Sequence, residues 1–150
     1  MSRVMVNKAG RVRGQAVKKL EVDEALIALF IGAMDANEHV AREELARAHH
    51  LIWSTRRFRR KSGETVGRLI ARMKRLVEEQ DRAAVMESAA RAVPARLRPA
   101  AFALVADLLL ADGKIDGGER RFLQRLASSF RIPAGLATNV IDVMLVKNHL

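Results

Sequence analysis

The sequence predicts an all-α protein of seven helices, and three observations lead to this fold class. Ala, Leu and Arg are abundant, whereas the 150 residues contain 9 Gly and 3 Pro, a composition that favours helix over sheet. Apolar residues recur at the spacing of a helix face in successive segments, and none of these segments alternates as a half-buried strand does. The connections are short, so neighbouring helices are expected to pack antiparallel.

Three helices are expected in the first half of the chain, over 24–36, 41–53 and 64–80. Asp23 is expected to cap the first helix. Glu43 and Glu44 stand in the first turn of the second, where the positive end of the helix dipole favours anions. The third carries an apolar stripe at helical spacing, formed by Val66, Leu69, Ile70, Met73, Leu76 and Val77.

A linking helix capped by Asp81 is expected at 81–92, followed by helices at 99–111, at 117–130 and from Pro133 onward. Pro99 suits a first-turn position. The helix at 99–111 is apolar along most of its length and is therefore expected to be central. Asp107 lies inside it and would be costly to bury alone, so it is expected to meet an Arg or a helix N-terminus.

The two halves of the chain resemble each other. A shift of 75 residues (112 − 37) places Leu29 on Leu104, Asn37 on Asp112 and Glu44 on Glu119. The repeat predicts two pseudo-symmetric three-helix halves joined by the linking helix, which makes seven helices in all.

Positive charge is concentrated in two places, and the formal net charge is +10. Residues 1–20 are expected to form a disordered basic arm before a single helical domain at 21–150. The second basic cluster comprises Arg56, Arg57, Arg59, Arg60 and Lys61. The favoured interpretation is a solvated tail and a solvated loop.

The alternative is that residues 1–19 and 56–61 bind nucleic acid, an anionic membrane surface or an acidic protein. Only Trp53 and Phe58 are aromatic near the second cluster. Contact with phosphates, without reading of base sequence, is therefore the expected mode.

Several function classes are excluded by what the sequence lacks. There is no Cys, so neither a disulfide framework nor a thiolate site can form. The apolar runs at 25–34 and 100–111 are shorter than the ~20 residues that span a bilayer, and the basic N-terminal residues lack the apolar stretch of a secretory signal. No metalloprotease motif, phosphate loop or nucleophile elbow occurs, so no enzymatic activity is expected.

The most specific feature is the turn at 112–119, which reads Asp-Gly-Lys-Ile-Asp-Gly-Gly-Glu. Gly113 suits the left-handed position after a helix C-terminus. Asp116 is a good N-cap with Glu119 three residues later, as in a capping box. A corner between two helices explains most of the motif without a ligand.

Oxygen-bearing residues at this corner and at its repeat also suit calcium or magnesium. Asp112 stands at the negative end of a helix, where a carboxylate needs a positive neighbour. The predicted ligands are Asp35, Asn37, Glu44, Asp112, Asp116 and Glu119. The turn is no EF-hand, because Leu123 occupies the position of the bidentate Glu. Caps and salt bridges remain the alternative use of these carboxylates.

The stretch at 98–130, with its Ala-Asp-Gly-Lys-Ile-Asp-Gly-Gly-Glu core, resembles TerB-like (tellurite resistance) domains, and a fainter likeness extends over 23–149. The resemblance implies a seven-helix fold with two related halves, in a bacterial cytoplasmic protein linked to tellurite or chemical stress. It implies a binding or scaffold role with protein partners, near the inner membrane face, and metal at two acidic corners. Asp112 and Glu119 match the motif of the second corner. The usual Asp-Gly of the first is replaced by Asp35-Ala-Asn37-Glu-His39, which argues against a symmetric metal site.

Overall fold

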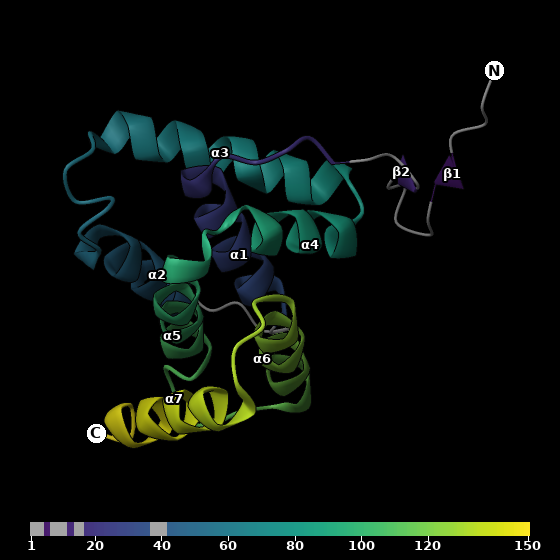
Figure 1. The fold of residues 1–150 in the computed structure, drawn as a ribbon. Coiled ribbons are helices and arrows are strands. Elements are labelled where there is room, and N and C mark those ends of the chain that lie inside the picture. The colour runs from purple at the N-terminus through teal and green to yellow at the C-terminus, as the bar shows by residue number, and fades with distance from the viewer. Residues whose placement is uncertain (1–4, 7–11, 14–16, 37–41) are drawn as a thin grey trace.

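The described residues form seven α-helices, which make up the body of the protein (Figure 1). The computed structural model describes residues 5–6, 12–13, 17–36 and 42–150. The elements are α1 (Val22–Ala36), α2 (Arg42–Ser54), α3 (Gly63–Glu79), α4 (Arg82–Ala92), the short 3-10 helix η1 (Ala95–Leu97), α5 (Arg98–Leu109), α6 (Gly117–Ser129) and α7 (Ala134–Lys147). The predicted all-α class and the helix count are confirmed.

Two strands of two residues each lie in the segment that was predicted to be an arm. β1 (Met5–Val6) pairs antiparallel with β2 (Val12–Arg13). Runs this short carry no alternation for a sequence pattern to detect. The other residues up to 16 lie outside the described residues, so the disordered arm stays a prediction. Leu20, which was assigned to the arm, is 5% exposed and belongs to the core.

Helix α1 lies at the centre of the core and contacts α3, α4, α5 and α6. Its apolar side chains run nearly all round, so Ile27, Leu29 and Phe30 are buried. At Gly32, a Cβ would lie 2.2 Å from the sulfur of Met86. The missing side chain lets α4 pack directly against α1 at this point.

The predicted cap of α1 is wrong. The helix begins at Val22, and the Glu21 backbone N–H donates to Oε1 of Glu24 at 2.9 Å. Asp23 therefore lies in the first turn, and its carboxylate pairs instead with Arg57 and Lys61. At α4, Asp81 does occupy the N-cap position, but its side chain makes no capping hydrogen bond.

Some of the helix contacts recur between the two halves of the chain. α1 contacts α3, α5 and α6, while α5 contacts the corresponding helices α7, α1 and α2. The linking helix α4 packs on α1, α3 and α6. The symmetry of the two halves themselves stays a prediction.

Candidate functional site

The turn at 112–119 joins α5 to α6 and has the conformation that its sequence predicts. Gly113 has a φ of 74°, in the left-handed region, and its N–H donates to the Leu110 carbonyl at 3.0 Å. A Cβ at Gly113 would lie 3.1 Å from the carbonyl oxygen of Asn148. Glycine is therefore needed both for the backbone angle and for the close approach of the end of α7.

Asp116 and Glu119 form the predicted capping box. The Glu119 N–H donates to Oδ1 of Asp116 at 2.7 Å, and the Asp116 N–H donates to Oε1 of Glu119 at 3.1 Å. Asp112 accepts from the Lys114 N–H through Oδ1 at 3.1 Å. One oxygen of each carboxylate thus accepts a hydrogen bond from a backbone N–H group of the turn.

Glu119 is the buried member of this group, with 5% of its surface exposed. Burial disfavours its charged form and raises its pKa to about 7, although the hydrogen bond from the Asp116 backbone acts in the opposite direction. The nearby charges of Asp116 and Asp112 raise the pKa further. Near neutral pH the Glu119 side chain is therefore present in both its protonated and its ionised form, whereas an ordinary Glu is ionised.

The end of α1 meets this corner. A Cβ at Gly118 would lie 3.0 Å from the carbonyl oxygen of Ala36, the last residue of α1. Carbonyls at a helix C-terminus lack partners within the helix and carry the negative end of its dipole. The Ala36 carbonyl oxygen and Oδ1 of Asp116 therefore both lie close to Gly118.

The six predicted ligands do not all come together. Asp35 pairs with Arg82 of α4 at 3.1 Å, while Asn37 and the side chain of Glu44 lie outside the described residues. Among the side chains that the structure describes, no group of three His, Cys, Asp or Glu is arranged to hold a metal ion. Asp112, Asp116 and Glu119 share one turn without forming a complete coordination shell.

Asp107 lies at the centre of a second polar cluster, and its predicted Arg partner is confirmed. It accepts from Arg47 of α2 at 2.9 Å, from Lys147 of α7 at 2.9 Å and from Asn148 at 3.1 Å. Burial alone would raise the pKa of Asp107, but hydrogen bonds from Lys147, Asn148 and Arg47 outweigh it and hold the pKa below the usual range. The charged Asp107 side chain thus links α5 to α2 and to the end of α7.

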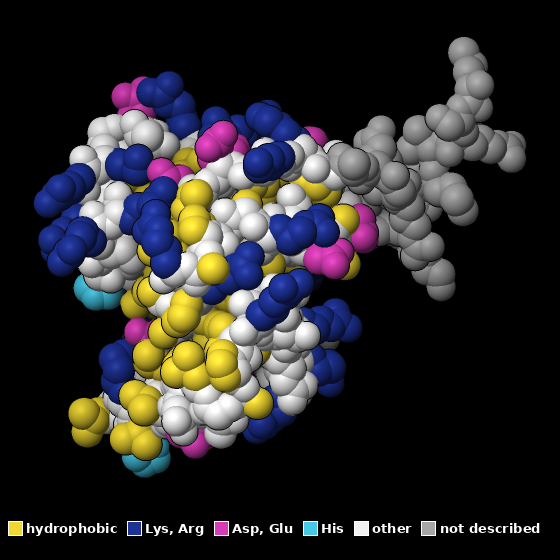
Figure 2. All heavy atoms as spheres, in the orientation of Figure 1, with side chains coloured by type: hydrophobic (Ala, Val, Ile, Leu, Met, Phe, Trp, Pro, Cys, Tyr) yellow, Lys and Arg dark blue, Asp and Glu magenta, His cyan; other side chains and the backbone are white. Residues whose placement is uncertain are grey.

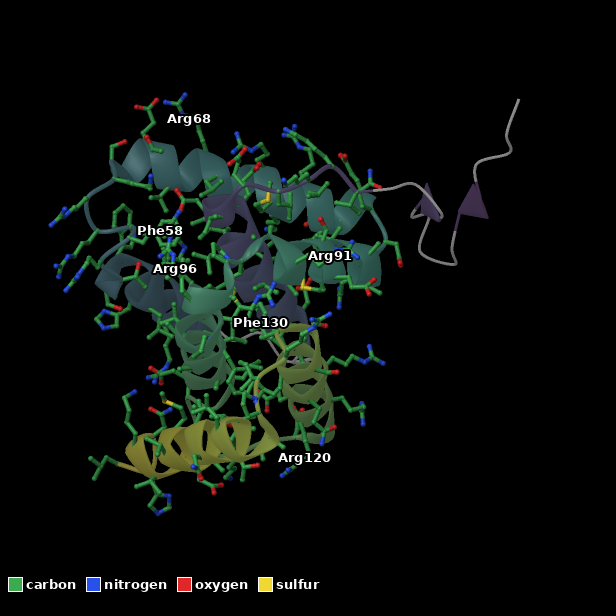
Figure 3. All side chains as sticks on the ribbon, in the orientation of Figure 1. Phe58, Arg68, Arg91, Arg96, Arg120 and Phe130 are labelled. Atoms are coloured by element: carbon green, nitrogen blue, oxygen red, sulfur yellow. The ribbon has the colours of Figure 1, made fainter. Side chains whose placement is uncertain are left out.

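The basic cluster at 56–61 divides into two groups. Arg57 and Lys61 pair with Asp23, and Phe58 between them is 1% exposed and anchors the loop in the core (Figure 3). The other three, Arg56, Arg59 and Arg60, are exposed and make no ion pair within the described part of the chain. Figure 2 shows dark-blue side chains gathered over the loop between α2 and α3. Because Phe58 is buried, it is not available to stack on a base.

These features define a helical domain with an acidic corner at 112–119. A family model described as tellurite resistance protein TerB matches residues 23–141, and the chain belongs to the TerB family. The resemblance inferred from the sequence is thereby confirmed. Neither a search of curated proteins nor a search of solved structures found a match. In the part of the chain that the structure describes, no helix is both long and apolar enough to cross a membrane.

Proposed function

We propose that this chain is a non-enzymatic TerB-family binding domain whose corner at 112–119 takes a divalent cation and so stiffens the joint between α1 and α6. One observation carries the proposal: the buried carboxylate of Glu119 has no basic partner among the described residues. Three other buried or half-buried carboxylates do have one. Glu24 pairs with Arg72 at 3.3 Å, Asp107 with Arg47 at 2.9 Å, and Asp23 with Lys61 at 3.1 Å.

This contrast is informative because the chain holds 27 Lys and Arg against 17 Asp and Glu. The charged form of a buried carboxylate beside two others is costly, and either protonation or a bound cation relieves that cost. Asp112, Asp116 and Glu119 each retain a second oxygen that accepts no hydrogen bond from a described residue. With the Ala36 carbonyl, these oxygens are the hard ligands that calcium and magnesium prefer.

A weak site is expected rather than a tight one. The corner lacks a complete set of protein ligands, so water would fill several coordination positions, as magnesium tolerates well. Sites of this kind hold calcium with dissociation constants on the order of 10⁻⁴ to 10⁻³ M. Such a site responds to millimolar changes of the ion and does not bind it permanently.

A thermal-shift titration tests the proposal. Millimolar calcium or magnesium at pH 7.5 is expected to raise the Tm, and Glu119→Gln or Asp112→Asn is expected to remove that rise. Asp142→Asn on α7 is the matched control, because Asp142 is an exposed carboxylate far along the chain from the corner. Sodium chloride at equal ionic strength controls for screening. If calcium, magnesium, manganese and zinc all leave the Tm unchanged, the metal proposal is wrong.

Catalysis by Glu119 is disfavoured by its position. A carboxyl group with a pKa near 7 has the right basicity for proton transfer. However, Glu119 is 5% exposed and its Oε1 is engaged by the Asp116 backbone, so a substrate could not reach that oxygen. Family membership supports the non-enzymatic role, protein partners, a cytoplasmic place near the inner membrane face and a link to tellurite or chemical stress, all of which stay proposals.

Anion binding by Arg56, Arg59 and Arg60 is the second candidate function. It is favoured by the exposure of these three side chains on a loop that Phe58 and Asp23 hold in place. Because Phe58 is buried and Trp53 is half-buried, the loop suits contact with phosphates of any sequence. Binding that does not weaken as salt rises would contradict this candidate.

A further inference from the structure

A groove of about 540 Å³ lies between α4 and α6, away from the corner at 112–119. Its volume is in the range of small-molecule sites. Apolar side chains line most of it: Leu29, Ala83, Met86, Ala90, Phe122 and Leu126.

The groove exists because α4 presents small residues to α6. Ala83 and Ala90 stand where larger side chains would fill the space. Met86 points toward α1, where Gly32 leaves room for its sulfur. Phe122 and Leu126, four residues apart on α6, face the same space.

The polar rim carries more donors than acceptors. Arg82, Arg125, Ser128 and Ser129 line the groove, and Glu87 is its one acidic residue. Nη2 of Arg82 forms an ion pair with Oδ2 of Asp35 at 3.1 Å, but its Nε is buried with no hydrogen-bond acceptor in the described part of the chain. A buried donor without an acceptor is uncommon and marks a place where an acceptor would be favourable.

Arg125 is the cation most free to meet a ligand, because it is exposed and makes no ion pair with any described residue. Figure 2 shows Lys and Arg side chains on both α4 and α6 around this part of the surface. Glu87 would repel a second negative charge, so a ligand with one anionic group and an apolar remainder fits better than an acidic peptide.

We propose that the α4–α6 groove binds an amphipathic carboxylate of the medium-chain fatty-acid type. The apolar chain would lie over the half-buried Met86 and Phe122, and the carboxylate would accept hydrogen bonds from Arg125 and the neighbouring hydroxyl groups. Burial of apolar surface would drive binding, and the charged hydrogen bonds would select the anion.

Calorimetric titration of the full chain with decanoate, below its micelle concentration, tests this inference. Saturable binding at one site is expected, whereas decyltrimethylammonium, which has the same tail and the opposite charge, is expected not to bind. Arg125→Gln is expected to weaken decanoate binding about tenfold or more, since a hydrogen bond to a charged group is lost. Arg120→Gln is the matched control, because Arg120 lies at the end of α6 away from Phe130 (Figure 3).

Ala83→Phe tests the location, because Ala83 is exposed at the groove edge and a larger side chain there fills the groove from outside the core. Loss of binding with an unchanged circular dichroism spectrum is expected. Absence of saturable binding, equal binding of the cationic amphiphile, or decanoate binding that survives both Arg125→Gln and Ala83→Phe would overturn the inference. Binding of an acidic helical peptide in place of decanoate would also overturn it.

Discussion

The carbonyl oxygen of Ala36 lies 3.0 Å from the point where a Cβ of residue Gly118 would be. The end of α1 and the first turn of α6 therefore meet backbone to backbone, with no side chain between them. The capping box of Asp116 and Glu119 lies in the same turn. The close backbone contact, the helix cap and the carboxylate charges thus all lie where α1 meets α6.

Gly118→Ala is expected to lower the free energy of unfolding by about 1 kcal/mol, because the new methyl group presses on backbone that cannot move aside freely. Gly67→Ala on α3 is the matched control, since nothing lies within 4 Å of its added Cβ. That change is expected to stabilise the protein by about 0.5–1 kcal/mol through helix propensity. Urea unfolding measures both, and equal effects of the two substitutions would contradict the close contact.

The ion pairs and hydrogen bonds of Asp107 are expected to stabilise the fold more than an ion pair on the surface does. Asp107→Asn leaves Arg47 and Lys147 facing each other without a carboxylate and is expected to cost about 2 kcal/mol. Glu64→Gln is the control, because the Glu64–Arg68 pair is 77% and 72% exposed, and its loss is expected to cost about 0.5 kcal/mol or less. Denaturant titration at pH 7 measures the loss of stability in both variants, and equal losses would contradict the role of Asp107.

Glu119 is expected to make stability fall as pH rises. Its folded pKa of about 7 lies above the ordinary value of 4.5, so the folded state holds the proton more tightly than the unfolded state does. Its contribution is complete below pH 4.5 and is lost as pH rises through 7, by on the order of 2–3 kcal/mol. Unfolding of the wild type and of Glu119→Gln at pH 5 and pH 8 measures this, and Gln is expected to be relatively more stable at pH 8. An equal difference between the two proteins at both pH values would show that the folded pKa is not raised.

In the loop at 56–61, different arginines are expected to contribute to anion binding and to stability. Replacing Arg56, Arg59 and Arg60 by Gln is expected to weaken binding to single-stranded DNA and to lower the salt slope by about 2, as three phosphate contacts are lost. Arg57→Gln should instead lower stability, because Asp23 loses a partner. Fluorescence anisotropy over a salt series checks the first effect. An unchanged slope in the triple variant would exclude this loop as the anion surface.

Much of the fold could be predicted because helix patterns are local. Periodicity predicted the seven helices, and the spacing of Asp116 and Glu119 predicted a capping box that the structure confirms. The cost of burying Asp107 predicted an Arg partner, but Lys147 and Asn148 lie 40 and 41 residues away, where no local pattern reaches. Asp23 was mistaken for a cap because its partners, Arg57 and Lys61, come from a distant loop.

Only part of the candidate site could be predicted from the sequence. The acidic turn was recognised from its residues, but the approach of Ala36 to Gly118 depends on how α1 and α6 pack. Phe58 is one of the two aromatic residues near the basic cluster, and the sequence alone does not show that it is buried. A single aromatic residue within a charged run has no periodic neighbours to show which way it faces. The α4–α6 groove likewise arises from facing helices and has no signature in either helix alone.

Proton release on calcium binding is the sharpest test of a cation site at the corner at 112–119. Calcium is titrated into the protein at pH 7 in two buffers of different ionisation enthalpy, so that the difference in heat counts the protons released. Because Glu119 has a pKa of about 7, release of about half a proton per bound ion is expected, falling toward zero at pH 8.5. Glu119→Gln should abolish the release. Calcium that gives no binding heat, or that binds wild type and Glu119→Gln equally well without proton release, would contradict a cation site at this corner.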